Sequence, residues 1–269
     1  MMRSMRRFSI LWASVLCAAS AAGQTVHISH CLEACPEVSH ADNEVVVRHL
    51  YAAAIDQNTG MAEWVAYRVL AESVGVASLL PRWWQQDELL TTSVQLEDDD
   101  EPDFVQPDLS DAQDREYRIN EISFTSDDQG RLAPMTSFAG TPYWDELNYL
   151  SNMSQLPQSL RMGAWSRLDQ AANELVAESE QLYVVSGPLY SYAGNSNSNP
   201  QSPSAYFKVI SDGSAVAAFV FDSELPPHAH HCDQLASLQQ IESRLDRQIL
   251  PARPDLVESG LYQRLGCRQ

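Results

Sequence analysis

Lysine is almost absent from this chain of 269 residues, which contains only one, Lys208. Arginine supplies nearly all of the positive charge, and 36 acidic residues against 17 basic ones give a formal net charge of -19. A surface this acidic repels polyanions at long range. Broad electrostatic attraction to nucleic acid is therefore excluded, and any such affinity requires a local cluster of arginines.

Long apolar runs are also missing after the N-terminus. Three arginines precede an apolar run over residues 8–19, and Ala19-Ser20-Ala21 offers a small-x-small cleavage site. The run is too short to span a bilayer, and no later segment is apolar enough. We predict a signal peptide over residues 1–23 and one domain over 24–269, secreted or periplasmic, soluble and without a membrane anchor. Cleavage removes three arginines and no acids, so the mature charge is -19 - 3 = -22.

Cysteine is scarce, and its number is informative. Loss of Cys17 with the signal leaves four cysteines, an even set in a chain bound for an oxidising compartment, which predicts two disulfides. Three pairings are possible. The alternative is a zinc site that combines cysteines with His230 and His231, although the spacing fits no standard zinc finger. The four cysteines are Cys31, Cys35, Cys232 and Cys267.

Histidine is missing from the whole middle of the chain. All seven histidines lie before Leu50 or after Pro227. Three of them, His228, His230 and His231, are close together. Such a group forms either a flexible surface patch or a transition-metal site.

Runs of β-branched and aromatic residues between turn signals predict strands. Val45–Val47 and Trp64–Val69 flank the turn sequence Asp56–Gly60, which predicts a hairpin. Three later runs predict three further strands. They are Leu182–Gly187, Ala205–Ile210 and Ala215–Phe221.

Apolar residues at helical spacing predict two helices. The first runs from about Arg161 to about Glu178, and the second is a terminal amphipathic helix over Asp233–Ile249. The apolar face of the first helix consists of Trp165, Leu168, Ala172, Leu175 and Val176.

Three short motifs lie between Asp127 and Asp169. They resemble, without a gap, the active-site core of the DNA/RNA non-specific endonucleases, which are secreted ββα-metal nucleases. The family signature runs Asp-Arg-Gly-His-x-Ala-Pro, Asn-Tyr-Leu-Ser-Asn and Asn-x-Gly-Ala-Trp-x-Arg-Leu-Glu. The matching residues here are Asp128, Gly130, Ala133 and Pro134, then Asn148-Tyr149-Leu150-Ser151-Asn152, then Gly163-Ala164-Trp165 with Arg167-Leu168.

The resemblance extends over nearly the whole mature chain and implies an α+β fold, with a central antiparallel sheet flanked by helices. Together with the short Cys31-x3-Cys35 spacing, it favours the pairs Cys31–Cys35 and Cys232–Cys267. It also implies hydrolysis of DNA or RNA phosphodiesters, with a grip on the backbone more than on base edges.

Four positions depart from the family pattern. Arg131 occupies the position of the general-base histidine, and Arg161 that of the metal-binding asparagine. Gln129 replaces the motif arginine, and Asp169 replaces a glutamate. Family members are understood to use one hydrated Mg²⁺, held mainly by that asparagine and by water bonded to a carboxylate, while the histidine activates the attacking water.

Arginine can take over neither role. Its pKa stays above ~12, so Arg131 has no lone pair with which to accept a proton. A guanidinium at position 161 repels a divalent cation by several kcal/mol at a separation of ~5 Å. We therefore expect Mg²⁺ to be lost and Asp169 to pair with Arg161 instead.

Arg82 is the one further candidate for a functional arginine. It lies in Pro81-Arg82-Trp83-Trp84, which resembles a family segment whose arginine contacts the scissile phosphate. The alternative is a structural arginine stacked on Trp83 or Trp84.

Three functions follow from these residues. The first is an impaired family member that binds DNA or RNA phosphate through Arg82, Arg131 and Arg161. The second is an active endonuclease with a rearranged site, in which Asp127 or Asp128 is the base and Asn152 helps to hold metal. The third is an interaction protein whose acidic surface docks a basic partner.

Overall fold

The structure is a computed structural model that describes residues 27–57, 60–90, 117–119, 122–124, 129–190, 202–258 and 260–268. The predicted signal peptide lies outside these residues, and so do Asp127 and Asp128.

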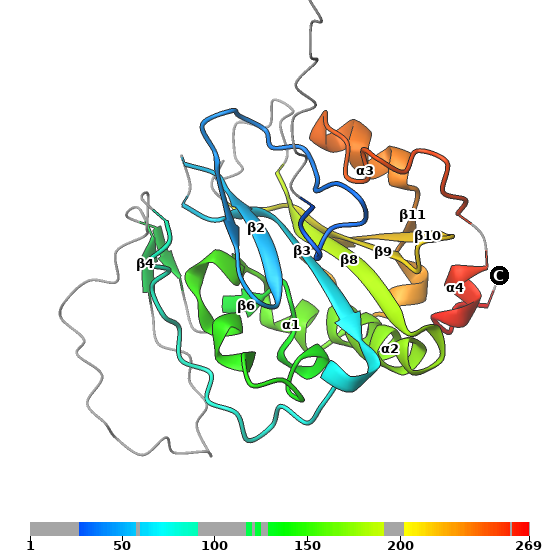
Figure 1. Cartoon of the computed structure of the whole chain (residues 1–269), viewed down its shortest axis with the longest axis horizontal. Coiled ribbons are helices and arrows are strands. Elements are labelled where there is room, and N and C mark those ends of the chain that lie inside the picture. The colour runs from blue at the N-terminus through cyan, green and yellow to red at the C-terminus, as the bar shows by residue number, and fades with distance from the viewer. Residues whose placement is uncertain are drawn as a thin grey trace, which may run out of the picture.

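A seven-stranded antiparallel sheet organises the fold (Figure 1). The strands follow the order β1-β2-β3-β8-β9-β10-β11, and every neighbouring pair is antiparallel. With the flanking helices, this sheet confirms the predicted α+β class, and β8, β9 and β10 confirm the three later strands. The bounds are β1 (Glu44–Val47), β2 (Tyr51–Ile55), β3 (Ala62–Leu70), β8 (Gln181–Leu189), β9 (Ala205–Ser211), β10 (Val216–Asp222) and β11 (Leu235–Ala236).

The predicted hairpin was wrong in one of its strands. The turn after Ile55 joins β2 to β3, whereas Val45–Val47 belongs to β1, which pairs with β2 at the edge of the sheet. The sequence of β2, Tyr-Ala-Ala-Ala-Ile, has few of the branched residues that signal a strand. All five residues are buried, so alanine is used where both faces of the strand are covered.

Two small sheets lie outside the main one. In the first, β4 (Tyr117–Ile119) pairs with β5 (Ile122–Phe124). In the second, β6 (Gln129–Arg131) pairs with β7 (Met153–Gln155) and places Arg131 opposite Met153. The second sheet therefore fixes the backbone of Arg131.

The first predicted helix is divided in two by Gly163. Instead of one helix from Arg161, α1 (Gln158–Arg161) ends before the glycine and α2 (Ala164–Ser179) begins after it. A Cβ on Gly163 would lie 2.6 Å from the Ser159 carbonyl oxygen and 2.9 Å from that of Pro227, so a side chain has no room there. The predicted apolar face of α2 is confirmed, since all five of its residues are buried.

The C-terminal helices are shorter than the predicted one. α3 (Leu238–Leu245) begins at a reciprocal cap between Ser237 and Gln240 and ends at Asp246, whose φ is 53°. A separate turn, α4 (Leu261–Arg264), follows near the chain end. None of the helices in the described part of the chain is long and apolar enough to cross a membrane. The 3-10 helices are η1 (Ala71–Ser73), η3 (Met135–Ser137), η4 (Trp144–Asn148), η5 (Leu150–Asn152) and η6 (His231–Asp233).

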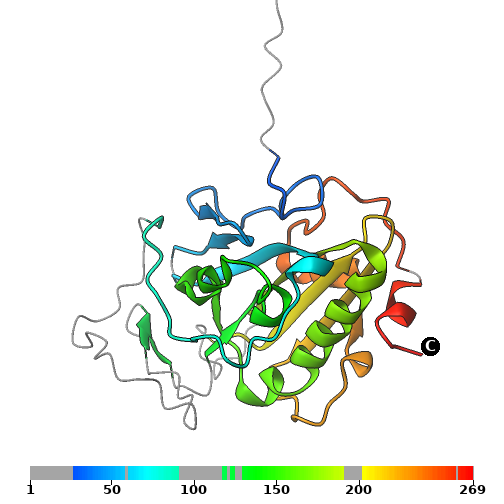
Figure 2. The same cartoon turned by 60° about the horizontal axis from the view of Figure 1, so that its bottom comes forward.

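The main sheet carries a hydrophobic core on each face. In β2, Tyr51, Ala53 and Ile55 belong to the core that includes α2, and the two alternate alanines belong to the core that includes Ile241 of α3. Figure 2 shows α2 running along one face of the sheet. Strand alternation thus builds a layered domain with α2 held firmly against the sheet.

Both predicted disulfides are confirmed. Cys31 is bonded to Cys35, with Cα atoms 4.9 Å apart, and Cys232 is bonded to Cys267, with Cα atoms 5.1 Å apart. The second bond ties the chain end to η6.

Acid is expected to destabilise the fold partly through His30. Its Nε2 donates to the Arg48 carbonyl at 2.8 Å, and burial lowers its pKa in spite of that bond, with the charge of Arg68 acting in the same direction as burial. The unfolded chain therefore binds the proton at a higher pH, and stability is lost as the pH falls below about 6.5. In urea titrations from pH 7 to pH 5, His30→Gln, which keeps a donor but does not titrate, should show a smaller loss. An equal loss would contradict this role.

Candidate functional site

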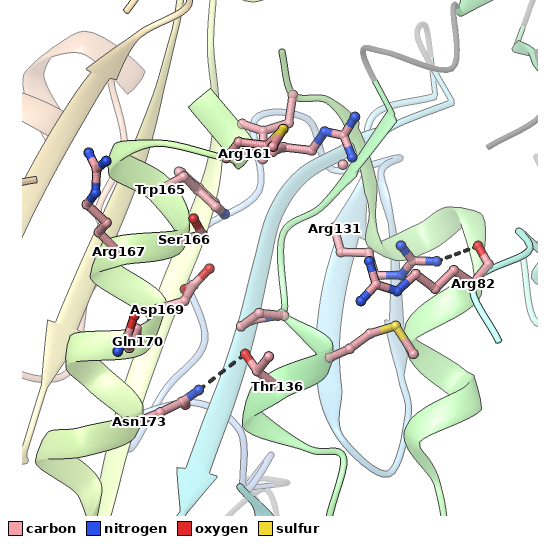
Figure 3. Close-up of a pocket in the computed structure, with 15 residues that line it drawn as sticks. Arg82, Arg131, Thr136, Arg161, Trp165, Ser166, Arg167, Asp169, Gln170 and Asn173 are labelled. Atoms are coloured by element: carbon pink, nitrogen blue, oxygen red, sulfur yellow. Dashed lines mark hydrogen bonds between the residues drawn. The ribbon is translucent and has the colours of Figure 1, made fainter. Parts of the chain in front are cut away.

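A cleft of about 670 Å³ opens beside α2 and β6 (Figure 3). The described residues that line it include four arginines and a single acidic residue, Asp169, so their formal charge is +4 - 1 = +3. This contrasts with the charge of -19 for the whole chain. The local arginine cluster that nucleic-acid affinity would require is therefore present. The arginines are Arg82, Arg131, Arg161 and Arg167.

Arg131 is held firmly at the end of β6. Its guanidinium lies over the ring of Trp84, 4.3 Å from the centroid, and donates to Asn148 Oδ1 at 2.6 Å and to the Arg82 carbonyl at 2.7 Å. Asn148 is fully buried and also donates to the Pro81 carbonyl. The arginine stacked on Trp84 is thus Arg131 and not Arg82, whose own guanidinium reaches the Ala77 carbonyl at 3.5 Å.

Arg161 reaches the cleft from the end of α1 by packing against β6. A Cβ on Gly130 would lie 2.9 Å from Arg161 Cδ, so the glycine leaves room for the aliphatic part of the arginine. Figure 3 shows the Arg161 side chain pointing away from Asp169. Arg131 and Arg161 therefore line the same cleft.

The predicted pair between Asp169 and Arg161 was wrong. Asp169 pairs with Lys208 of β9, and both side chains are buried. The Lys208 ammonium also lies 3.8 Å from the centroid of the Trp165 ring. Burial raises the pKa of Asp169 and lowers that of Lys208, and the charge of each opposes the shift of the other. The prediction placed Arg161 and Asp169 on one helix, but the break at Gly163 separates them.

The side chain of Asn152 forms hydrogen bonds with backbone groups. Its side chain is fully buried, and Oδ1 accepts from the Ala133 N–H at 2.8 Å. Its Nδ2 donates to the carbonyls of Ala133 and Leu147, each at 3.0 Å. These bonds use the amide to fix the segment after Arg131, which argues against Asn152 as a metal ligand in a rearranged site. Asp128, a candidate base in that hypothesis, lies outside the described residues.

A second, partly buried ion pair supports the Asn-Tyr-Leu-Ser-Asn segment. Asp87 is 1% exposed, pairs with Arg48 and accepts a hydrogen bond from the Ser151 hydroxyl. The Arg48 guanidinium also lies 4.0 Å from the centroid of the Tyr149 ring. Most of the Asn-Tyr-Leu-Ser-Asn segment therefore has a structural role, and its Asn148 holds the Arg131 guanidinium.

Comparison with known proteins agrees with this architecture. The family model for DNA/RNA non-specific endonucleases matches residues 36–246. The chain belongs to the DNA/RNA non-specific endonuclease family. A protein from Serratia marcescens described as "Nuclease" is 32% identical over 266 residues, covering 94% of this chain and 92% of the relative.

Two further comparisons give a lower sequence identity. A "Nuclease" from Nostoc sp. (strain PCC 7120) is 24% identical over 171 residues, covering 63% of this chain and 54% of the relative. A chain in the crystal structure of the EndoG/EndoGI complex, which concerns the mechanism of EndoG inhibition, superposes with a TM-score of 0.58 at 18% identity. That match covers 80% of this chain and 91% of the other, and it shows that the two share a fold.

The residues of this endonuclease-family protein do not fit the hydrated Mg²⁺ that its family resemblance implies. Position 161 carries a cation, the carboxylate of Asp169 is bonded to the Lys208 ammonium, and the Asn152 amide is bonded to backbone. Hard divalent cations require oxygen ligands, and the described lining of the cleft offers no carboxylate other than Asp169.

The sequence interpretation missed three features of the site. Lys208 was a detectable signal, because a lone lysine inside an apolar strand needs a carboxylate partner when it is buried. Arg167 was noted only as part of a motif, yet it lines the cleft and donates to the Ala229 carbonyl. The position of Arg131 over Trp84 had no local signal, since 47 residues separate them, 131 - 84.

Proposed function

We propose that this member of the DNA/RNA non-specific endonuclease family is exported and binds the phosphate backbone of DNA or RNA without hydrolysing it by the family mechanism. The observation that carries the proposal is the cleft, where four arginines accompany one carboxylate that is already paired with lysine. Among the described residues, the cleft thus has groups that attract phosphate and lacks a histidine or an additional carboxylate that would activate water.

The loss of hydrolysis follows from the side chains themselves. Arg131 cannot accept a proton from water, because guanidinium has no available lone pair. Its bonds to Asn148 and to the Arg82 carbonyl also stabilise the charged form in place. Arg161 repels the cation that would stabilise the developing charge on phosphate. Both requirements of the family mechanism are therefore removed at once.

Retention of phosphate binding follows from the same residues. Guanidinium groups form bidentate hydrogen bonds with phosphate oxygens, and they do so irrespective of base sequence. The acidic remainder of the protein weakens long-range attraction, so binding should be modest and sensitive to salt. We expect no preference for a particular base sequence.

Export rests on the N-terminal sequence. Residues 1–23 have the charge and apolar pattern of a signal peptide, which would leave a single domain over 24–269. Two disulfides in the fold support an oxidising destination, either secreted or periplasmic.

Binding is tested by titrating labelled single-stranded DNA and RNA with the purified mature protein across a salt series. The variant Arg161→Gln should bind several-fold more weakly and lower the slope of log affinity against log salt by about 1, because one phosphate contact is lost. Arg264→Gln is the matched control, since Arg264 pairs with Asp212 away from the cleft and should leave the slope unchanged.

Two outcomes would favour the alternatives. If neither polymer binds even at low salt, the acidic surface is better explained by docking of a basic protein partner. If the protein cuts plasmid DNA or RNA when Mg²⁺ or Mn²⁺ is added, and Asp128→Ala abolishes the cleavage, the site is an active, rearranged one.

A further inference from the structure

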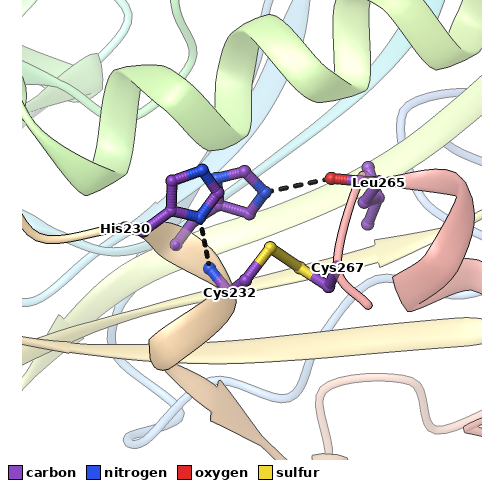
Figure 4. Close-up of a disulfide and its surroundings, with 5 residues drawn as sticks. His230, Cys232, Leu265 and Cys267 are labelled. Carbon is purple, nitrogen blue, oxygen red and sulfur yellow. Dashed lines mark hydrogen bonds between the residues drawn. A yellow bond between two sulfur atoms is a disulfide. The ribbon is translucent and has the colours of Figure 1, made fainter. Parts of the chain in front are cut away.

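Two histidines and a cysteine lie close together at the start of η6, where a disulfide links this segment to Cys267 (Figure 4). One potential ligand atom from each of His230, His231 and Cys232 lies within 4.8 Å of the others. The sulfur of Cys232 is bonded to that of Cys267, which adds a fourth potential ligand to the group. Nitrogen and sulfur ligands of these types are those that zinc prefers in proteins.

His231 has the environment of a metal ligand. It is 4% exposed, and its Nε2 lies 3.0 Å from the Leu265 carbonyl, which can only accept, so Nε2 carries the proton. The lone pair is therefore on Nδ1, which has no hydrogen-bond partner among the described residues. A buried acceptor without a partner is costly. Metal-binding histidines commonly donate their second nitrogen to a carbonyl in this way, which fixes the tautomer.

His230 lies next to this nitrogen on the solvent side. Its ring stacks on that of His231, with centroids 4.4 Å apart, and its Nδ1 accepts from the Cys232 N–H at 3.2 Å. His230 is exposed, so it can turn without disturbing the core. The second imidazole thus provides an adjustable ligand beside a fixed one.

We propose that reduction of the Cys232–Cys267 disulfide creates a zinc site formed by both thiolates and the two imidazoles. In a tetrahedral zinc site, bonds of about 2.0 to 2.3 Å place neighbouring ligand atoms roughly 3.3 to 3.8 Å apart. The three ligand atoms within 4.8 Å therefore need to approach by only about an ångström, and the two sulfurs separate once their bond is broken.

Reduction of the Cys232–Cys267 disulfide requires a reductant, for which a dithiol is suitable. The reductant gives two electrons and two protons to the disulfide, which yields two cysteine thiols and an oxidised, disulfide form of the reductant. Zinc then binds both sulfurs as thiolates and releases the two protons. A newly made chain whose cysteines are still thiols reaches the same state without a reductant.

The site would preserve the anchor of the chain end. Cys267 and Leu265 are buried beside α4, and the disulfide is the covalent link that holds them to η6. Zinc coordination would replace this link in the reduced chain by joining the same two segments. The proposed zinc ligands include none of the cleft arginines, so zinc binding is measured separately from nucleic-acid binding.

The test uses the full mature chain carrying Cys31→Ser and Cys35→Ser, so that one disulfide remains. After reduction with a water-soluble phosphine, we expect one zinc bound per chain, a thiolate-to-metal absorption band with Co²⁺, and a higher melting temperature with zinc. The oxidised protein should show none of these. His230→Ala and His231→Asn should each weaken binding at least tenfold, whereas His228→Ala, the matched control, should not.

Several results would overturn the proposal. These are equal zinc binding before and after reduction, no binding by the reduced chain, or binding that both histidine variants leave unchanged. If the double serine background fails to fold, the comparison is made with wild-type protein and with Cys232→Ser/Cys267→Ser, which should bind one zinc fewer. If the reduced variant binds as much zinc as the reduced wild-type protein, the proposed site is wrong.

Discussion

The double variant Arg131→His/Arg161→Asn is expected to cleave DNA and RNA in the presence of Mg²⁺ at least about 100-fold faster than the unmodified chain, since a positioned general base contributes about 10² to 10⁴ in rate. Histidine at 131 restores a group that can accept a proton on a backbone that β6 and β7 hold in place. Asparagine at 161 removes the guanidinium and provides a neutral oxygen. Plasmid and RNA digestion measures the gain.

Control variants test whether the gain in cleavage comes from positions 131 and 161 in particular or from the lower positive charge of the cleft. Each single change should stay near background, because Arg131→His leaves the repulsive guanidinium and Arg161→Asn leaves the site without a base. The pair Arg82→His/Arg167→Asn alters two other arginines of the same cleft and should gain nothing. A folded double variant at positions 131 and 161 without activity would show that these positions do not silence the site alone.

Lys208→Met should destabilise the fold by about 3 to 5 kcal/mol, as expected when one partner of a buried pair is removed. The change leaves the buried Asp169 carboxylate with no compensating charge and removes the ammonium that lies over the Trp165 ring. Methionine approximates the volume of lysine, so the loss comes from charge and not from a cavity. Urea titration at neutral pH measures the free energy of unfolding.

A double-mutant cycle identifies the origin of that loss. Lys208→Met/Asp169→Leu should recover most of the stability, because replacing a whole buried pair with apolar groups is often neutral. Arg264→Met is the control, since it removes a partly exposed pair with Asp212 and should cost less than about 1 kcal/mol. A similarly small cost at Lys208 would mean that the pair does not hold the core.

Local patterns predicted the elements whose signals are strong. Strands β8 to β10 are runs of branched and aromatic residues, and α2 has a regular apolar face. The alanine-rich β2 had no such signal, since its strand conformation comes from neighbours on both sides. The break at Gly163 was equally hidden, because it depends on the Pro227 carbonyl, distant in sequence.

The candidate site was predictable in position but not in its pairings. Family resemblance placed Arg131 and Arg161 at the active-site core, and both line the cleft. The partner of Asp169 depends on a strand that arrives 39 residues later, 208 - 169, and sequence spacing on one helix favoured the wrong arginine. Which charges meet is a property of the assembled sheet and of the helix packed on it.

The most direct test of phosphate binding without hydrolysis is the fluorescence anisotropy of an end-labelled oligonucleotide, followed for hours with excess mature protein and Mg²⁺ at low salt. We expect the anisotropy to rise on mixing, to stay constant, and to fall to the value of the intact free oligonucleotide when salt is added. A metal-dependent decay below that value, absent from a mock preparation, would mean that labelled fragments are being released and that the arginines at 131 and 161 have not silenced the enzyme.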